Sequence, residues 1–164
     1  MASALAPKLA LARAVAALSR LRGGGATSAP GRFLMALDSD AIAALGARLA
    51  RGSVLVSATN GKTTTAAMAA RIFERTGFTL VHNRAGANMA GGVAAALLAA
   101  ARPHRQMAGE LGLFEIDELW LDAIASQLGP RAVLLETCSA TSSTATASWR
   151  RSPPAGRRGC AQSA

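Results

Sequence analysis

Short apolar runs alternate with longer segments of helical periodicity along most of this chain. Apolar runs of strand length occur at residues 54–58, 78–82, 111–116 and 131–135. Because strands that alternate with helices form parallel sheets with right-handed crossovers, the pattern predicts an α/β fold with a parallel sheet. The segments expected to be helical are residues 4–22, 41–50, 63–76, 89–101 and 119–128.

The segments between these elements contain residues that turn the chain or begin helices. Residues 23–31 (Gly-Gly-Gly-Ala-Thr-Ser-Ala-Pro-Gly) predict a flexible connection. Residues 38–40 (Asp-Ser-Asp) and Asn88 are candidate caps for the helices that follow them, and so are Asp117 and Glu118. A capping role for Asn88 would need no ligand.

The first predicted strand breaks into a polar turn at residues 59–64 (Thr-Asn-Gly-Lys-Thr-Thr) and then into a helix. Backbone N–H groups at a helix N-terminus attract phosphate, Lys62 adds positive charge, and the Thr63 hydroxyl is suited to hold Mg²⁺. The general pattern Gly-x-x-x-x-Gly-Lys-Thr would need glycine where Val56 stands, so this is a shorter form of a phosphate-binding loop, or P-loop. The alternative is an ordinary strand-to-helix turn that happens to contain Gly-Lys-Thr.

Residues 59–64 resemble the signature of the Mur ligase family, the ATP-dependent amide-forming enzymes of peptidoglycan synthesis, together with folylpolyglutamate synthases. The family usually has glycine before the Thr-Asn pair, where this chain has Ala58. The resemblance implies a parallel sheet of the Mur ligase central-domain type, incomplete in this chain, that binds ATP and Mg²⁺ with Lys62 as a catalytic residue. The residues expected to bind the nucleotide are Thr59, Asn60, Gly61, Lys62, Thr63 and Thr64.

A second polar segment follows the second predicted strand, at the strand end where open α/β sheets place their ligands. Asn83 and Arg84 are candidate nucleotide-binding residues there, and a structural role is the alternative for both. Residues 82–89 (His-Asn-Arg-Ala-Gly-Ala-Asn-Met) resemble the equivalent segment of one branch of the family, the MurT-type subunit of lipid II isoglutaminyl synthase. This second match narrows the resemblance to that branch.

Glu115 lies within a strand that is otherwise predicted to be buried. An unpaired buried carboxylate is costly, so a cation partner is expected, and Mg²⁺ commonly bridges carboxylates and nucleotide phosphates. In the Mur ligase family a glutamate at this place is a magnesium ligand, and residues 114–118 (Phe-Glu-Ile-Asp-Glu) resemble the MurT-type version. We therefore expect Glu115 to be catalytic and, with Thr63, to hold Mg²⁺.

The formal charge of +9 on 164 residues would ordinarily indicate nucleic acid or an anionic membrane as a partner. Residues 137–164, however, contain four arginines and no acid, which leaves +5 for residues 1–136, so no nucleic acid is expected. Cys138 and Cys160 also lie in that segment and could form one disulfide. Nothing else suggests secretion, so a reducing, cytoplasmic location is expected.

From residue 137 onward the periodicity disappears, which predicts a disordered tail at residues 137–164. Plausible codons for residues 136–149, read from the last base of the Glu136 codon, encode Asn-Leu-Phe-Arg-Asp-Gln-Leu-Asp-Arg-Tyr-Gly-Glu-Leu. That string resembles the segment that follows this strand in MurT-type proteins, so we expect a frameshift at about Glu136 and an out-of-frame tail. The family's four-cysteine zinc site lies beyond this point, so zinc is not expected to bind Cys138 or Cys160.

The expected organisation has N-terminal helices and a linker at residues 1–50, part of a Mur ligase central domain at residues 51–136, and the tail. The resemblance implies an ATP-dependent ligase subunit that amidates the D-glutamate of the lipid II stem peptide, at the membrane surface, to D-isoglutamine. The ammonia would come from a GatD-type glutaminase partner. Two alternatives remain open: an amino-acid ligase of the Mur or folylpolyglutamate synthase type, and a nucleotide-binding chain without catalysis. This chain alone is expected to be inactive.

Overall fold

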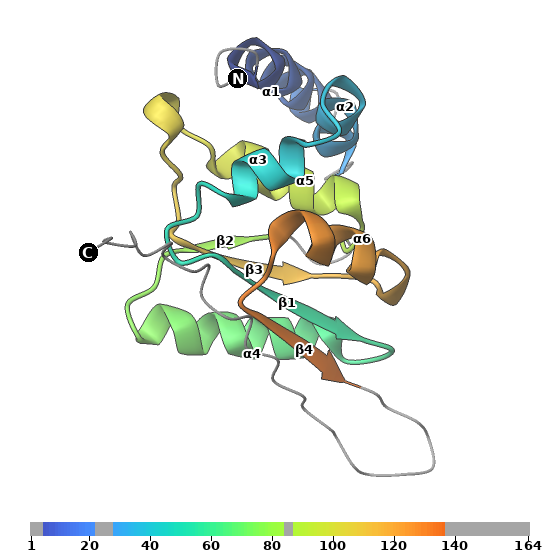
Figure 1. Cartoon of the computed structure of the whole chain (residues 1–164), viewed down its shortest axis with the longest axis vertical. Coiled ribbons are helices and arrows are strands. Elements are labelled where there is room, and N and C mark those ends of the chain that lie inside the picture. The colour runs from blue at the N-terminus through green and yellow to red at the C-terminus, as the bar shows by residue number, and fades with distance from the viewer. Residues whose placement is uncertain (1–4, 22–27, 84–86, 137–164) are drawn as a thin grey trace, which may run out of the picture.

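Four parallel strands form the sheet around which the chain is folded. The computed structural model describes residues 5–21, 28–83 and 87–136. The strand order is β2-β3-β1-β4 and all neighbouring strands run parallel, which confirms the predicted α/β fold (Figure 1). The two central strands, β1 and β3, are almost entirely buried, as expected for parallel strands covered on both faces. The strands are Ser53–Ala58 (β1), Leu80–His82 (β2), Leu111–Glu115 (β3) and Ala132–Glu136 (β4).

Helices cover both faces of this sheet. α4 (Lys62–Arg75) lies on one face, and α5 (Ala90–Ala100) and α6 (Glu118–Leu128) lie on the other (Figure 1). The connection from β1 passes β3 to reach β2 at one edge, whereas the connection from β3 passes β1 to reach β4 at the other edge. The chain therefore leaves the adjacent strands β1 and β3 in opposite directions. Open α/β sheets bind ligands in the crevice that forms at such a point, at the carboxyl ends of the strands.

Three helices precede the sheet and share its core. They pack with α5 and α6 on the face opposite α4 (Figure 1). Leu9 and Leu34, from the first two of these helices, belong to the same hydrophobic cluster as Leu55 of β1 and Phe114 of β3. The three helices are Leu5–Leu21 (α1), Ala29–Leu37 (α2) and Ala41–Gly46 (α3), and a short 3₁₀ turn, Pro103–Arg105 (η1), precedes β3.

α2 begins at Ala29, within the segment predicted to be a flexible connection, so that prediction is wrong for the last residues of the segment. Pro30 fits the first turn of a helix because the N–H groups there have no partner within the helix. Gly31 allows a close helix contact, since a Cβ atom on it would lie 1.9 Å from the carbonyl oxygen of Gly91 in α5. Two residues that predict a loop therefore begin a tightly packed helix.

The ends of two other helices also differ from the prediction. α3 ends at Gly46 instead of residue 50, because the N–H group of Leu49 bonds to the carbonyl of Gly46, three residues back, in a tighter turn. α5 begins after Met89, so Asn88 is not its N-cap, and the cap prediction for Asn88 is wrong. The prediction for Asp117 is confirmed, since its carboxylate accepts a hydrogen bond from the N–H group of Leu119 at the start of α6.

Several predictions concern residues outside the described ranges. Arg84, residues 137–164 and both cysteines lie outside these ranges. The nucleotide-binding role of Arg84, the disordered tail and the frameshift therefore stay predictions. The division at residue 50 also stays a prediction, although the helices before it share a core with the sheet. None of the helices in the described ranges has the length and apolar character needed to cross a bilayer.

Candidate functional site

The polar turn at residues 59–61 lies between a buried strand and a helix, as its sequence predicts. β1 ends at Ala58 and α4 begins at Lys62. Gly61 is the N-cap of α4 and has a φ of +82°, a left-handed conformation that glycine adopts without strain. Because glycine has no side chain to cap the helix, the N–H groups of the first turn and the positive end of the helix dipole can face an anion.

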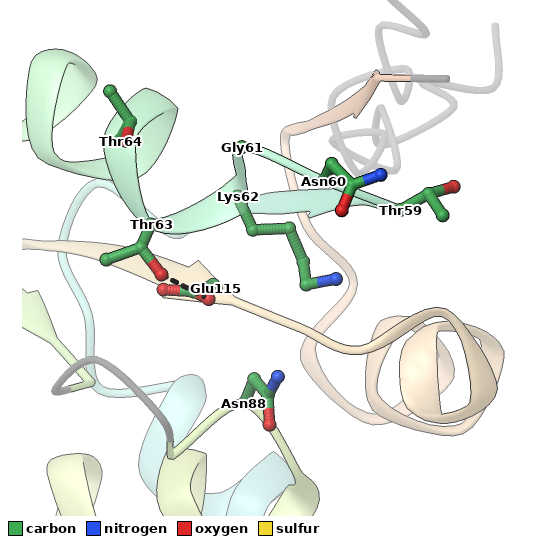
Figure 2. Close-up of a pocket in the computed structure, with 8 residues that line it drawn as sticks. All are labelled: Thr59, Asn60, Gly61, Lys62, Thr63, Thr64, Asn88 and Glu115. Atoms are coloured by element: carbon green, nitrogen blue, oxygen red, sulfur yellow. Dashed lines mark hydrogen bonds between the residues drawn. The ribbon is translucent and has the colours of Figure 1, made fainter. Parts of the chain in front are cut away.

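A pocket of about 400 Å³ opens beside this turn, a size within the usual range for small-molecule sites. It lies at the carboxyl ends of β1 and β3, the two strands that the chain leaves in opposite directions. Figure 2 shows the lining side chains, most of which come from the turn and the start of α4. The lining residues are Thr59, Asn60, Gly61, Lys62, Thr63, Thr64, Asn88 and Glu115. The structure thus brings together all the residues predicted at 59–64 and Glu115.

Lys62 provides the positive charge of the pocket. Its ammonium group donates a hydrogen bond to the carbonyl of Ala58, the last residue of β1. Figure 2 shows its side chain extending from the turn on the side where Glu115 and Asn88 lie. A lysine side chain is a compact charge on a flexible stem, so the ammonium can turn from this carbonyl to an anion in the pocket.

Thr63 and Glu115 meet across the gap between α4 and β3. The Thr63 hydroxyl donates to Glu115 Oε1 at 3.0 Å (Figure 2). Glu115 is only 4% exposed, as predicted, but neither ion pair found among the described residues includes it. No cationic side chain in the described part of the chain therefore forms an ion pair with this carboxylate. The carboxylate has an acceptor oxygen available for a bound cation instead.

Asn83 is not among the lining residues. It is 1% exposed, and its side-chain amide bonds to the main chain of Glu115 and of Ala87 instead of facing the pocket. Among the two alternatives left open by the sequence, this geometry favours the structural role. Arg84, its neighbour in the prediction, lies outside the described residues.

Three residues at the site were not predicted to be there. Asn88 lines the pocket. Glu118 accepts a hydrogen bond from the Thr59 hydroxyl at 2.9 Å, and Glu136 accepts from the Thr65 hydroxyl at 2.9 and 3.0 Å to its two oxygens. Glu118 and Glu136 each lie at the carboxyl end of a strand or just beyond it, so a search restricted to such positions could have found both.

Curated relatives show what this chain resembles. Two proteins from Staphylococcus aureus, of strains N315 and COL, are each 31% identical to it over 120 residues. Both are named lipid II isoglutaminyl synthase (glutamine-hydrolyzing) subunit MurT. The match covers 73% of this chain but only 26% of each relative, so the chain spans about a quarter of their length. No protein-family model matches the chain.

The similarity extends well beyond the short motifs that carried the resemblance in the sequence. The motifs at 59–64, 82–89 and 114–118 cover a small part of the 120 matched residues. Over most of its length, this chain is a relative of the MurT-type subunits, as its sequence motifs predicted.

Proposed function

We propose that the pocket binds the triphosphate of ATP. The observation that carries this proposal is the convergence of three features in one pocket at the β1–β3 crevice. These are the glycine-capped N-terminus of α4, the Lys62 ammonium, and the Thr63–Glu115 pair. Backbone N–H groups and the helix dipole would bind the phosphate oxygens, and Lys62 would neutralise part of their charge.

Thr63 and Glu115 would hold the Mg²⁺ that accompanies the nucleotide. Mg²⁺ prefers oxygen ligands in an octahedron at about 2.1 Å, so two neighbouring ligand oxygens lie roughly 3 Å apart. The Thr63 hydroxyl and Glu115 Oε1 are 3.0 Å apart. When bound, the ion would neutralise charge on the phosphates. The donor set of the pocket therefore fits the metal.

The reaction that this site would serve is amide formation. The relatives are named as synthase subunits that form the isoglutaminyl group of lipid II. By this resemblance, the D-glutamate carboxyl group of the stem peptide would take the γ-phosphoryl group of ATP to form an acyl phosphate, with release of ADP. Ammonia would then attack the acyl carbon and displace phosphate to form the amide. Lys62 would stabilise charge on the phosphoryl group during transfer. A glutaminase partner would supply the ammonia, and the chain would meet lipid II from the cytoplasm.

A second candidate function is nucleotide binding without catalysis. It is favoured by the make-up of the described pocket. The described pocket contains groups that could bind phosphate and metal, but no evident set of side chains that would bind a stem peptide. Both candidate functions predict that the chain binds ATP, but only the ligase predicts that the amide forms.

The purified chain distinguishes them when it is incubated with Mg²⁺, ATP and lipid II, with either ammonium or a glutaminase and glutamine as the ammonia source. Mass spectrometry then measures amidation of the stem peptide. Amide that forms in the wild type and is lost in Lys62→Ala supports the ligase. Binding of ATP with no amide from either ammonia source supports the second candidate. Amide formation that persists in Lys62→Ala would contradict the role of the loop.

A further inference from the structure

Asn83 lies just beyond the point where the backbone pairing of β2 and β3 ends. The last paired residues of these strands are His82 and Leu113. Beyond them, the Asn83 side chain takes the place of a peptide group. Its Nδ2 donates to the carbonyl of Glu115 at 2.8 Å, and its Oδ1 accepts from the N–H group of Glu115 at 2.9 Å. Both main-chain polar groups of Glu115 are therefore fixed by one buried amide.

The same amide also holds the segment that brings Asn88 to the pocket. Nδ2 donates a second hydrogen bond, to the carbonyl of Ala87 at 2.7 Å. That carbonyl packs tightly against Gly92 of α5, where a Cβ atom would lie 1.9 Å from the oxygen. The next carbonyl, that of Asn88, accepts from the N–H group of Asp117 at 2.8 Å. Residues 87–88 are thus attached to the end of β3 by Asn83 on one side and by Asp117 on the other.

These bonds leave Asn83 no means of contacting a nucleotide directly. A primary amide has two N–H donors, and both are used on carbonyl acceptors. Its oxygen already accepts one hydrogen bond, and the residue is 1% exposed. Any effect of Asn83 on a ligand must therefore pass through Glu115 or through residues 87–88.

We propose that Asn83 is a positioning residue that sets the Glu115 carboxylate opposite Thr63 and holds Asn88 at the pocket. The inference rests on the proposed magnesium role of Glu115 and adds the residue that orients this ligand. Groups that orient metal ligands through hydrogen bonds typically change metal affinity about 10- to 100-fold when they are removed. Asn83 acts here on the main chain of the ligand residue, whose carboxylate makes the contact with Thr63.

The test is the gain in ATP affinity that Mg²⁺ provides, measured by calorimetry on the full chain with Mg²⁺ and with EDTA. Asn83→Ala should reduce this gain about tenfold. Leu97→Ala, a fully buried substitution in α5, is the control for loss of stability alone and should retain the gain. In the double variant Asn83→Ala/Glu115→Gln, the loss should be no larger than in Glu115→Gln, because both changes act on one ligand.

The outcomes separate this inference from the proposed function. A wild-type chain whose ATP affinity does not depend on Mg²⁺ would overturn the magnesium site and the inference with it. A wild-type gain that survives in Asn83→Ala within twofold would overturn the inference alone.

Should Asn83→Ala not fold, NMR on the wild-type chain gives the answer. The two Nδ2 protons of Asn83 should exchange slowly with solvent and show no nuclear Overhauser effect to bound ATP. Rapid exchange of those protons, or a direct Overhauser contact with the nucleotide, would overturn the positioning role.

Discussion

A buried carboxylate decides what the pocket can bind. Glu115 is 4% exposed and has the Thr63 hydroxyl as its side-chain partner. One hydroxyl satisfies only part of the hydrogen-bonding capacity of a carboxylate, and an ionised group removed from water is stabilised by a cation. Lys62, which follows the turn after β1, bonds to a backbone carbonyl and not to Glu115. The two opposite charges do not pair with each other, which in the proposed function leaves Lys62 for the phosphates and Glu115 for the metal.

Glu115→Gln tests this separation of roles. The substitution keeps the size of the side chain and an oxygen acceptor for Thr63, so the chain should fold. Loss of the negative charge should reduce the Mg²⁺-dependent gain in ATP affinity at least about tenfold, while affinity in EDTA stays equal or rises. Calorimetry with and without Mg²⁺ measures both quantities. Equal loss of affinity in both conditions would show that Glu115 supports the fold of the pocket instead of a metal.

The residues of the site were predictable from the sequence where a motif or a local rule marks them. Residues 59–64 are marked by a motif next to a strand and a helix, and Glu115 by its place in an apolar run. Glu136 is marked only by its place at the end of an apolar run, and Asn88 carries no such mark, because its position depends on which strand ends meet. Asn83 was placed near the correct strand end, but its role depends on a pairing with β3 that no local pattern specifies.

At the scale of the elements, the crossing of α2 and α5 leaves no room for an added side chain. The missing Cβ of Gly31 allows α2 to approach the carbonyl oxygen of Gly91, and Gly91 in turn lies close to Arg32 of α2. Local sequence could not predict this, since glycine and proline near Ala29 are ordinary signs of a loop. The strands and the helices after Ser53 were predictable because apolar runs of strand length alternate there with segments of helical periodicity.

Gly31→Ala should therefore destabilise the chain. A methyl group placed 1.9 Å from a backbone oxygen forces the two helices apart, and overpacking of this kind costs about 1–3 kcal/mol. Ala36→Ser, on the exposed side of the same helix, is the matched control and should have little effect. The measurement is the free energy of unfolding in urea. Equal stability of Gly31→Ala and the wild type would show that α2 does not pack on α5 as described.

The contact between α1 and the end of α2 should depend on pH. The hydrogen bond from the Lys8 ammonium, 3.0 Å from Asp38 Oδ2, lowers the pKa of the Asp38 carboxyl below its ordinary value. A carboxyl group with a lowered pKa in the folded state adds stability above the pKa of the unfolded chain and loses it as the pH falls. The pair is exposed enough that its contribution should be about 1 kcal/mol at most.

Asp38→Asn keeps an oxygen for the N–H group of Asp40 and removes the charge. Relative to the wild type it should be slightly less stable at neutral pH, and the difference should shrink as the pH falls below about 4, the ordinary pKa of an aspartate. Urea midpoints at both pH values measure this, with Asp122→Asn on the exposed side of α6 as the control. A difference that persists unchanged in acid would rule out the ion pair as its cause.

Across the whole molecule, one hydrophobic cluster joins the N-terminal helices to the sheet. Leu34 of α2 is fully buried in the same cluster as Leu55 and Phe114 from the central strands. The sequence suggested a boundary near residue 50 because a predicted helix ends there, just before the first predicted strand, but packing between distant segments is not visible in such a local pattern. The shared cluster implies that the helices and the sheet unfold together.

Leu34→Ala should accordingly weaken both parts. Removal of a fully buried leucine side chain costs about 2–5 kcal/mol. Native-state hydrogen exchange should show the same loss of protection in β1 and β3 as in α2. A loss confined to residues before 51 would show that the helices form a separate unit.

The binding site itself is tested most simply by the affinity of the purified chain for ATP in the presence of Mg²⁺. The wild type should bind, and Lys62→Ala should bind at least about tenfold more weakly, because charge-assisted contacts to phosphate contribute about 1.5–3 kcal/mol each. Arg71→Ala, which removes one positive charge from the exposed side of α4, should bind like the wild type. Absence of ATP binding by the folded wild-type chain, or equal binding by Lys62→Ala, would contradict the assignment of this pocket to a nucleotide.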